Sequence, residues 1–353
     1  MKLNSIDLYK IGIKRFDNPY TINFPVELSA QTFFVEEIVD DGTIANIKSD
    51  INYEDSGSKY IRFKLVKSGI STVKAIEIIS RKTGINFNAF SYFGMKDASA
   101  TTAQTVSVPF SEMALYRINK IKNSLRGITI SEVRKSDTPC NVGDNIGNRF
   151  TLKFKLLNEE EALLRGIDFI SRKGVRNYYS YQRFGKHNVN LKISYAVIKG
   201  YLGLAAQFLQ ETKLIKDKKG SDFLSYLNNL SKKLRIFILQ SYQPFLFNLL
   251  LSEMPAKFDE ELIIPGYDLF NYKLNYKDLI YKILEEQGIY YRELEVPSVP
   301  KLDMKCRFRK ARFFPQRIQL KKEDSLYSLS FELKKGEYAT NVFFDLFYND
   351  MHS

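Results

Sequence analysis

The apolar residues of this chain change their spacing near residue 188, and this change limits the folds that the chain can adopt. Before that point, alternating apolar and polar residues predict half-buried strands at 32–38, 60–67 and 150–156. A helix closed by Gly84 is predicted after Ser71. From 188 to about 300, apolar residues recur at helical spacing, notably at 193–209 and 227–254. The pattern then returns to strands, so we expect an α/β chain whose middle part is the more helical.

Length and composition exclude several classes of protein. The 353 residues suit two domains, and 44% hydrophobic residues can form a sizeable core. No run approaches the roughly 18 apolar residues of a membrane span, and the N-terminus lacks the apolar core of a signal peptide. We therefore expect a cytoplasmic protein. Cys140, Cys306, His187 and His352 are its only cysteines and histidines, so we expect no disulfide framework, metal site or Ser-His-Asp triad.

The chain is strongly basic, with a formal net charge of +13 and an isoelectric point near 9.3. Residues 301–322 contain nine lysines and arginines against one acid, Asp303, and phenylalanines are interleaved with them. Such a mixture suits a strand surface that grips a nucleic-acid backbone. RNA is favoured over DNA because no helix-turn-helix or zinc-finger pattern is present. A solvated basic surface is the alternative explanation.

A glycine-led turn at 94–97 places a carboxylate, Asp97, between a lysine and a predicted strand. A carboxylate held in this way can act as a nucleophile or a base. Taken alone, the same four residues also fit an ordinary surface turn, because glycine, lysine and aspartate are common there.

Several segments together resemble one family, the TruD family of tRNA pseudouridine synthases. Residues 94–104 are similar to its Gly-x-Lys-Asp-Arg-x-Ala-x-Thr-x-Gln signature. Residues 177–185 are similar to its Asn-Tyr-Phe-Gly-x-Gln-Arg-Phe-Gly block, and 147–150 to its Gly-Asn-Arg-Phe. Supporting matches lie at 241–248, 265–267, 309–315 and 336–340. The resemblance spans residues 31 to about 345 in the family's order.

The resemblance implies an enzyme that isomerises a uridine in RNA from an N-glycosidic to a C-glycosidic bond, without cofactor or metal. Asp97 takes the position of the family's indispensable aspartate. Its role as a nucleophile or as the base that removes a ribose proton stays open. The implied substrate is tRNA, at uridine 13 in the D-arm, and the implied state is a monomer.

The resemblance also implies residues that bind the target uridine, which must leave its stack to reach the pocket. Phe33 and Tyr338 take the positions of aromatic residues that face the base, although both could be core residues. Asn177 could hydrogen bond the uracil edge or Asp97, or it could cap a turn. Lys96 could pair with a phosphate or keep the carboxylate ionised, or it could form a weak surface ion pair.

Four arginines are candidates for contact with the RNA backbone: Arg149, Arg183, Arg309 and Arg312. For each of them, a structural salt bridge is an equal alternative. His187 has no predicted chemical role and is expected in a loop.

The sequence departs from the family pattern beside the proposed catalytic residue. Ala98 stands where the family has arginine, so one partner for a phosphate or a carboxylate is missing. Tyr179 replaces a phenylalanine, and Ser180 replaces a glycine. These differences concern how the substrate is held more than the reaction.

The implied architecture is a pseudouridine-synthase-like α/β (α+β) catalytic core with a mixed, largely antiparallel sheet, built from 1–187 and 306–353. Residues 188–305 would form an inserted lobe. One alternative is an inactive RNA-binding protein or RNA chaperone on the same fold. Another is a methyltransferase or a nuclease, which would need a glycine-rich cofactor turn or a metal-binding cluster, and the sequence shows neither.

Overall fold

The computed structural model describes residues 2–3, 6–96, 98–122, 124–156, 158–212, 222–299 and 302–347. The chain forms two compact units. The sheet unit comprises Met1–Leu3, Phe24–Arg172 and Phe314–Ala339, and the helical unit comprises Asn4–Asn23, Lys173–Phe313 and Thr340–Ser353. These units group residues 173–187 and 306–313 with the helical part of the chain. That residues 1–187 and 306–353 form the catalytic core and residues 188–305 an inserted lobe stays a prediction.

The sheet unit is built on a mixed sheet in which β1 and β4 are parallel and the other neighbouring strands are antiparallel. Its order is β11-β12-β6-β1-β4-β2-β5, and β3 pairs with β4. The strands are β1 Phe33–Ile38, β2 Tyr60–Ser68, β3 Ser91–Tyr92, β4 Thr101–Pro109, β5 Ile128–Ser136, β6 Gly147–Lys155, β11 Gln316–Glu323 and β12 Leu326–Lys334. This sheet confirms the predicted fold class.

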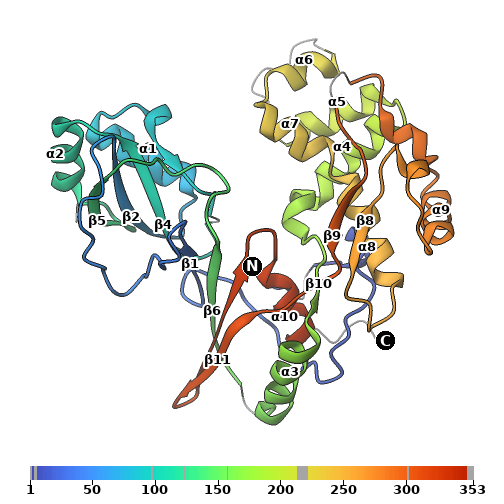
Figure 1. Cartoon of the computed structure of the whole chain (residues 1–353), viewed down its shortest axis with the longest axis horizontal. Coiled ribbons are helices and arrows are strands. Elements are labelled where there is room, and N and C mark those ends of the chain that lie inside the picture. The colour runs from blue at the N-terminus through green and yellow to red at the C-terminus, as the bar shows by residue number, and fades with distance from the viewer. Residues whose placement is uncertain are drawn as a thin grey trace. The chain divides into compact units, whose positions relative to one another are not determined.

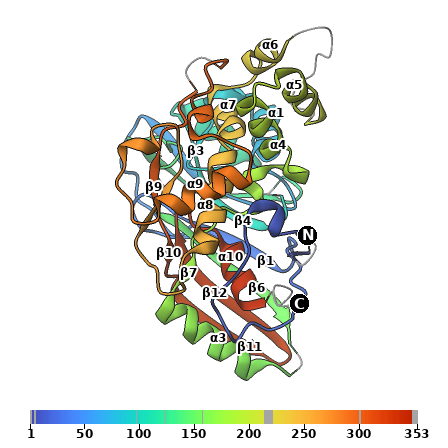
Figure 2. The same cartoon turned by 90° about the vertical axis from the view of Figure 1, so that its right-hand side faces the viewer.

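Three helices pack on the sheet unit: α1 Thr72–Thr83, α2 Glu112–Ile121 and α3 Glu160–Lys173. Helix α1 begins as predicted, because the Ser71 side chain accepts a hydrogen bond from the Lys74 N–H, and Gly84 ends it with φ 69°. Helices α1 and α2 lie beside β2, β4 and β5 (Figure 1) and close an apolar core there. Helix α3 lies along β11 (Figure 2), where the Glu160 carboxylate accepts from Lys322 Nζ and the Tyr327 hydroxyl.

The helical unit contains α4 Val189–Ile198, α5 Leu202–Glu211, α6 Phe223–Asn228, α7 Lys232–Leu239, α8 Tyr242–Glu253, α9 Lys277–Glu286 and most of α10 Ala339–Phe347. Its strands pair as β7 Val175–Arg176 with β10 Arg312–Phe313, and β8 Glu261–Ile264 with β9 Arg307–Lys310. The helical stretch predicted at 193–209 is two helices, because Gly200 adopts φ 75° after α4. Ser231 caps a separate helix, α7, inside the stretch predicted at 227–254. The Lys-Asp-Lys-Lys-Gly segment at 216–220, whose sequence predicts a loop between these stretches, lies outside the described residues.

Short 3-10 helices connect these elements: η2 Tyr9–Ile11, η3 Phe87–Ala89, η4 Tyr181–Phe184, η5 Lys186–Asn188, η6 Leu269–Asn271 and η7 Tyr291–Glu295. Within the described residues, no helix is both long and apolar enough to cross a lipid bilayer.

A buried ionic cluster ties both ends of the chain into the helical unit. The Asp17 carboxylate accepts from Arg176 Nε at 2.9 Å and is also ion-paired with Arg312. Burial alone would raise the pKa of Asp17, but hydrogen bonds and charges of the two arginines lower it. Next to it, the Asn18 N–H donates to the Asp345 carboxylate at 3.2 Å, and burial raises the pKa of Asp345 to about 7. The N-terminal segment and α10 are therefore joined through polar groups in the interior.

Candidate active site

Asp97 lies outside the described residues, but the residues before it are held firmly in the sheet unit. Lys96 Nζ donates to Glu37 Oε1 at 2.8 Å, and the two side chains are only 9% and 0% exposed. The second oxygen of Glu37 accepts from the Thr105 N–H at 2.9 Å. The amine of Lys96 is thus ion-paired with Glu37 inside the protein and does not form the weak surface ion pair that was one of its predicted alternatives.

Hydrogen bonds from α1 and β4 fix the turn itself. Thr72 Oγ1 accepts from the Lys96 N–H at 2.8 Å and donates to Gln104 Oε1 at 2.8 Å. Gln104 Nε2 then donates to the Gly94 carbonyl at 3.2 Å. The glutamine that closes the sequence signature therefore holds the glycine that opens it. Gln104 is fully buried, so this bond is shielded from water.

Sequence reasoning missed the supporting residues Glu37, Thr72 and Gln104. The strand period could have indicated Glu37, because it follows Phe33 and Val35 at intervals of two and must share their face of the sheet. A carboxylate on the inward face of a strand needs a partner, and Lys96 is that partner. Thr72 carried no comparable signal, since its position fits a first helical turn.

Strand pairing gathers a set of polar side chains on the face that carries Glu37. Glu37 pairs with Asn148 of β6, and Val35 pairs with Thr102 of β4. Thr102 in turn pairs with Lys67 of β2. Directly paired residues point to the same side of a sheet. We call this side the Glu37 face, defined by Phe33, Glu37, Lys67, Thr102, Gln104 and Asn148.

Two polar atoms on the Glu37 face are buried without a hydrogen bond to any described residue. They are Thr102 Oγ1 and Asn148 Oδ1. Leaving a buried polar group unpaired costs about 1–3 kcal/mol, so native proteins rarely do so outside functional sites. Asn341 Oδ1, in the helical unit, is the third such atom in the described part of the chain. Asn148 was not among the predicted site residues, although it lies in the Gly-Asn-Arg-Phe motif.

Phe33 and Tyr338 belong to the same unit as Lys96. The ring of Phe33 stacks on that of Phe150, with centroids 6.1 Å apart and planes 10° from parallel, and Phe33 is 8% exposed. Tyr338 is half-buried and follows a turn in which the Lys335 N–H donates to the Ile146 carbonyl at 3.2 Å. That contact joins the Tyr338 turn to the residues just before β6, the strand of Asn148.

Asn177 lies in the helical unit and uses its amide internally. Its Oδ1 accepts from Arg309 Nη2, and its Nδ2 donates to the Lys310 carbonyl at 3.0 Å. Arg309 Nε also donates to the Asn177 carbonyl at 3.0 Å. The arrangement fits a positioning residue for Arg309 better than a reader of uracil.

The side chain of Arg309 is held on an aromatic platform. Its guanidinium carbon lies 4.3 Å from the ring centroid of Tyr179 and 5.9 Å from that of Phe247. The residue is half-exposed, so a stacked arginine with some open surface can still contact a phosphate or a base.

The other three predicted backbone arginines have different surroundings. Arg149 is ion-paired with Glu36, Nη2 to Oε2 at 2.6 Å, and lies on the face of the sheet opposite Asn148. The guanidinium of Arg183 lies 4.3 Å from the ring centroid of Phe237. Arg312 forms a structural salt bridge, which was its alternative predicted role. Its side chain is 4% exposed, is ion-paired with Asp17, and donates hydrogen bonds to the Phe258 and Lys173 carbonyls.

The basic block at 301–322 is not one strand surface. Residues up to Phe313 belong to the helical unit, and those from Phe314 belong to the sheet unit. Arg312 is buried and paired with Asp17, so this residue does not contribute to an exposed basic surface, while the RNA-binding role of the rest of the block stays a prediction. A charge change at Arg312 would test the stability of the fold and not the grip on RNA.

The described residues contain neither a reactive thiolate nor a group of side chains that could hold a metal ion. Burial raises the pKa of both Cys140 and Cys306 to about 12, so neither forms a reactive thiolate at neutral pH. Over the described ranges, no three histidine, cysteine or carboxylate side chains are grouped as a metal site would require.

The sequence matches the family model described as tRNA pseudouridine synthase D (TruD) over residues 26–212 and 255–345. The chain belongs to the TruD family. The match includes Asp97, the Glu37 face and Tyr338. It also runs through both compact units, so the family assignment does not depend on one motif.

Relatives from bacteria and archaea support this assignment to a family of isomerases. The tRNA pseudouridine synthase D of Helicobacter acinonychis is 26% identical over 92% of this chain and 77% of its own length. The probable tRNA pseudouridine synthase D 2 of Methanococcus maripaludis is 25% identical over 96% of this chain and 97% of its own. A TruD protein crystal structure from Methanosarcina mazei has a TM-score of 0.68 at 19% identity, covering 97% and 98% of the two chains. This chain therefore has the same fold as that structure.

Proposed function

We propose that this TruD protein is a tRNA pseudouridine synthase that isomerises uridine 13 of the D-arm, with Asp97 as its essential carboxylate. The observation that carries the proposal is the fixed turn before Asp97. Glu37, Thr72 and Gln104 hold this turn in the interior of the sheet unit, inside the region that the family model matches. We further propose that the protein is a cytoplasmic monomer and that it uses neither a metal nor a cofactor.

The reaction needs one well-placed carboxylate and no oxidant. The N1–C1′ bond of the nucleotide breaks, the uracil turns, and a C5–C1′ bond forms, while the proton on C5 is lost and N1 gains one. Asp97 either attacks C1′ or removes the proton from C2′, and both routes require its ionised form. Lys96, directly before Asp97 in sequence, is ion-paired with Glu37 and helps to fix the turn that leads to this carboxylate.

We assign the reading of the uracil edge to Asn148 in place of Asn177. A uracil presents an N3–H donor between two carbonyl acceptors, and an amide oxygen is the natural acceptor for that donor. Asn148 Oδ1 is buried and without a partner among the described residues, whereas Asn177 Oδ1 already accepts from Arg309. Thr102 Oγ1 offers a second unpaired polar atom on the same face.

Substitution of Asn148 by alanine is expected to lower kcat/KM for tRNA by about 10–100-fold, since one buried hydrogen bond to the base is lost. Asn177→Ala is expected to weaken tRNA binding through Arg309 with a smaller effect on kcat. Steady-state kinetics and a binding titration on both variants separate these effects, and thermal melts check folding. A folded Asn148→Ala enzyme with wild-type kcat/KM would exclude Asn148 as the reader.

The proposed function is tested by incubating the purified protein with unmodified tRNA and mapping pseudouridine by carbodiimide chemistry and mass spectrometry. We expect one product, at position 13, and no product from a transcript with cytidine there. A product at another uridine would keep the reaction and correct the target. Binding without any product would support the inactive RNA-binding alternative instead.

A further inference from the structure

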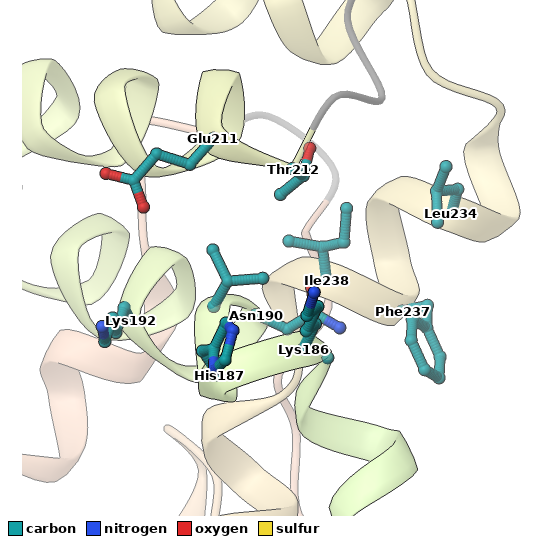
Figure 3. A pocket seen from close by; sticks show the side chains of 11 residues that line it. Lys186, His187, Asn190, Lys192, Glu211, Thr212, Leu234, Phe237 and Ile238 are labelled. Atoms are coloured by element: carbon teal, nitrogen blue, oxygen red, sulfur yellow. The ribbon is translucent and has the colours of Figure 1, made fainter. Parts of the chain in front are cut away.

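The helical unit contains a cavity of about 500 Å³ that the proposed chemistry does not use (Figure 3). Its walls come from the turn at 185–188 with the start of α4, from α7, and from the end of α5. This volume is within the range of about 300–1,000 Å³ that is usual for small-molecule sites. All the lining residues belong to one compact unit.

One wall of the cavity is cationic. Lys186, His187 and Lys192 line it, and all three are exposed. In the part of the chain that the structure describes, none of them forms an ion pair with an acidic side chain. They also lie at the N-terminal end of α4, whose N-cap residue, Asn188, makes no side-chain capping bond. Side-chain cations and the positive end of a helix dipole together favour an anion.

The backbone of this wall is held in an unfavourable conformation. His187 and Asn188 have φ values of 54° and 58°, a region that residues other than glycine rarely adopt. Such residues cost free energy and persist where the surrounding structure requires them, most often at binding sites.

A buried amide in the cavity wall has unused hydrogen-bonding capacity. Asn190 is only 6% exposed, yet its side chain makes no hydrogen bond to any residue that the structure describes. It fits there because Gly185 has no side chain: a Cβ atom at Gly185 would lie 2.9 Å from Asn190 Oδ1. The amide is therefore available to hydrogen bond a ligand in the cavity.

The facing wall is apolar and presents an aromatic ring. Leu234, Phe237 and Ile238 of α7 line it, and Phe237 is 40% exposed. Arg183 stacks at 4.3 Å on the Phe237 ring and steadies it. Glu211, on the end of α5, adds an acceptor that suits an amino group on a base edge (Figure 3). The cavity therefore combines a phosphate-binding side with a surface for a base.

We propose that this cavity binds one nucleotide of the RNA substrate, distinct from the uridine that reacts. Lys186, His187 and Lys192 hold its phosphate, and the base lies against Phe237. Asn190 hydrogen bonds the ribose or the base. The proposal rests on the proposed function in that the ligand is part of the tRNA. The site would strengthen binding and orient the tRNA without taking part in the chemical step.

The test compares a Lys186→Ser, Lys192→Ser double variant with a Lys257→Ser, Lys282→Ser control, which removes the same charge from exposed sites in the same unit outside the cavity. We expect the cavity variant to raise the tRNA Kd about tenfold and to reduce the slope of log Kd against log salt by about 2. The control should change the affinity much less. Phe237→Ser should raise the Kd about fivefold or more with an unchanged slope, because it removes stacking and not charge.

Pseudouridine formation at saturating tRNA separates this proposal from the proposed function, since kcat should be unchanged in the cavity variants. An inactive wild-type protein would overturn the function while the binding comparison still tested the cavity. Equal Kd values for cavity and control variants would overturn the cavity proposal. A second result would also overturn it. If cytidine monophosphate stabilised the wild type and not the cavity variant, and the two proteins bound tRNA as tightly as the control, the site would bind free nucleotides and not the RNA substrate.

Discussion

An Asp97→Asn variant is expected to lose pseudouridine formation by about 10⁴-fold while it still binds tRNA. Asparagine has nearly the shape of aspartate, so the fixed turn before it should be retained. It can neither attack C1′ nor accept a proton from the ribose, and losses of this size are typical when a catalytic base or nucleophile is removed. The measurement is single-turnover product formation together with a tRNA titration.

The matched control is Asp144→Asn, which removes the same charge from an exposed position in the sheet unit. It should retain activity close to that of the wild type. If Asp97→Asn formed pseudouridine at the rate of this control, the central role of Asp97 would be wrong, and the mechanism would need another carboxylate. Glu37 would not be a good substitute, because its oxygens already pair with Lys96 and Thr105.

The second large effect concerns stability. Asp17→Asn is expected to lower the free energy of unfolding by about 3–5 kcal/mol, because it leaves the buried cations Arg176 and Arg312 without their counter-charge. Urea unfolding followed by circular dichroism is the suitable measurement, since the chain has no tryptophan. We expect the loss in the transition of the helical unit.

Asp168→Asn is the comparison for this experiment. Asp168 also pairs with an arginine, Arg172, but its side chain is 56% exposed, and surface pairs contribute only about 0–1 kcal/mol. Equal urea midpoints for the two variants would show that the Asp17 cluster contributes no more than a surface ion pair. A further Arg312→Met change should recover part of the loss, because it removes one unpaired charge from the interior.

Helices and strands could be predicted from the sequence where the residues that determine them are close neighbours in the chain. The alternating residues of β1, β2 and β6 predicted strands, and Ser71 with Gly84 predicted the limits of α1. The stretch at 193–209 was predicted as one helical run because a glycine inside an apolar pattern is compatible with both a continuous helix and a break. Only the left-handed backbone at Gly200 decides between them.

The site could be predicted only in part, because the roles of its polar groups depend on partners that are distant in sequence. Asn148 and Asn177 both lie in family motifs, and nothing local shows which amide is already used. Arg309 holds Asn177, while the strand partners of Asn148 leave its oxygen unpaired. Arg312 similarly resembles Arg309 in sequence, and its burial follows from its contact with Asp17, near the opposite end of the chain.

The helical unit combines an early segment, Asn4–Asn23, with a late one, Thr340–Ser353, and this has a consequence for biosynthesis. The segment that holds Asp17 is synthesised long before α10, in which Val342 and Phe343 are fully buried. The sheet unit receives its last strands, β11 and β12, only shortly before that. The core of neither unit can therefore be completed until β12 and α10 have been synthesised, and we expect both units to fold late relative to the synthesis of their first segments. Until these late elements are available, a nascent chain of this design exposes unfinished cores and depends on protection from aggregation.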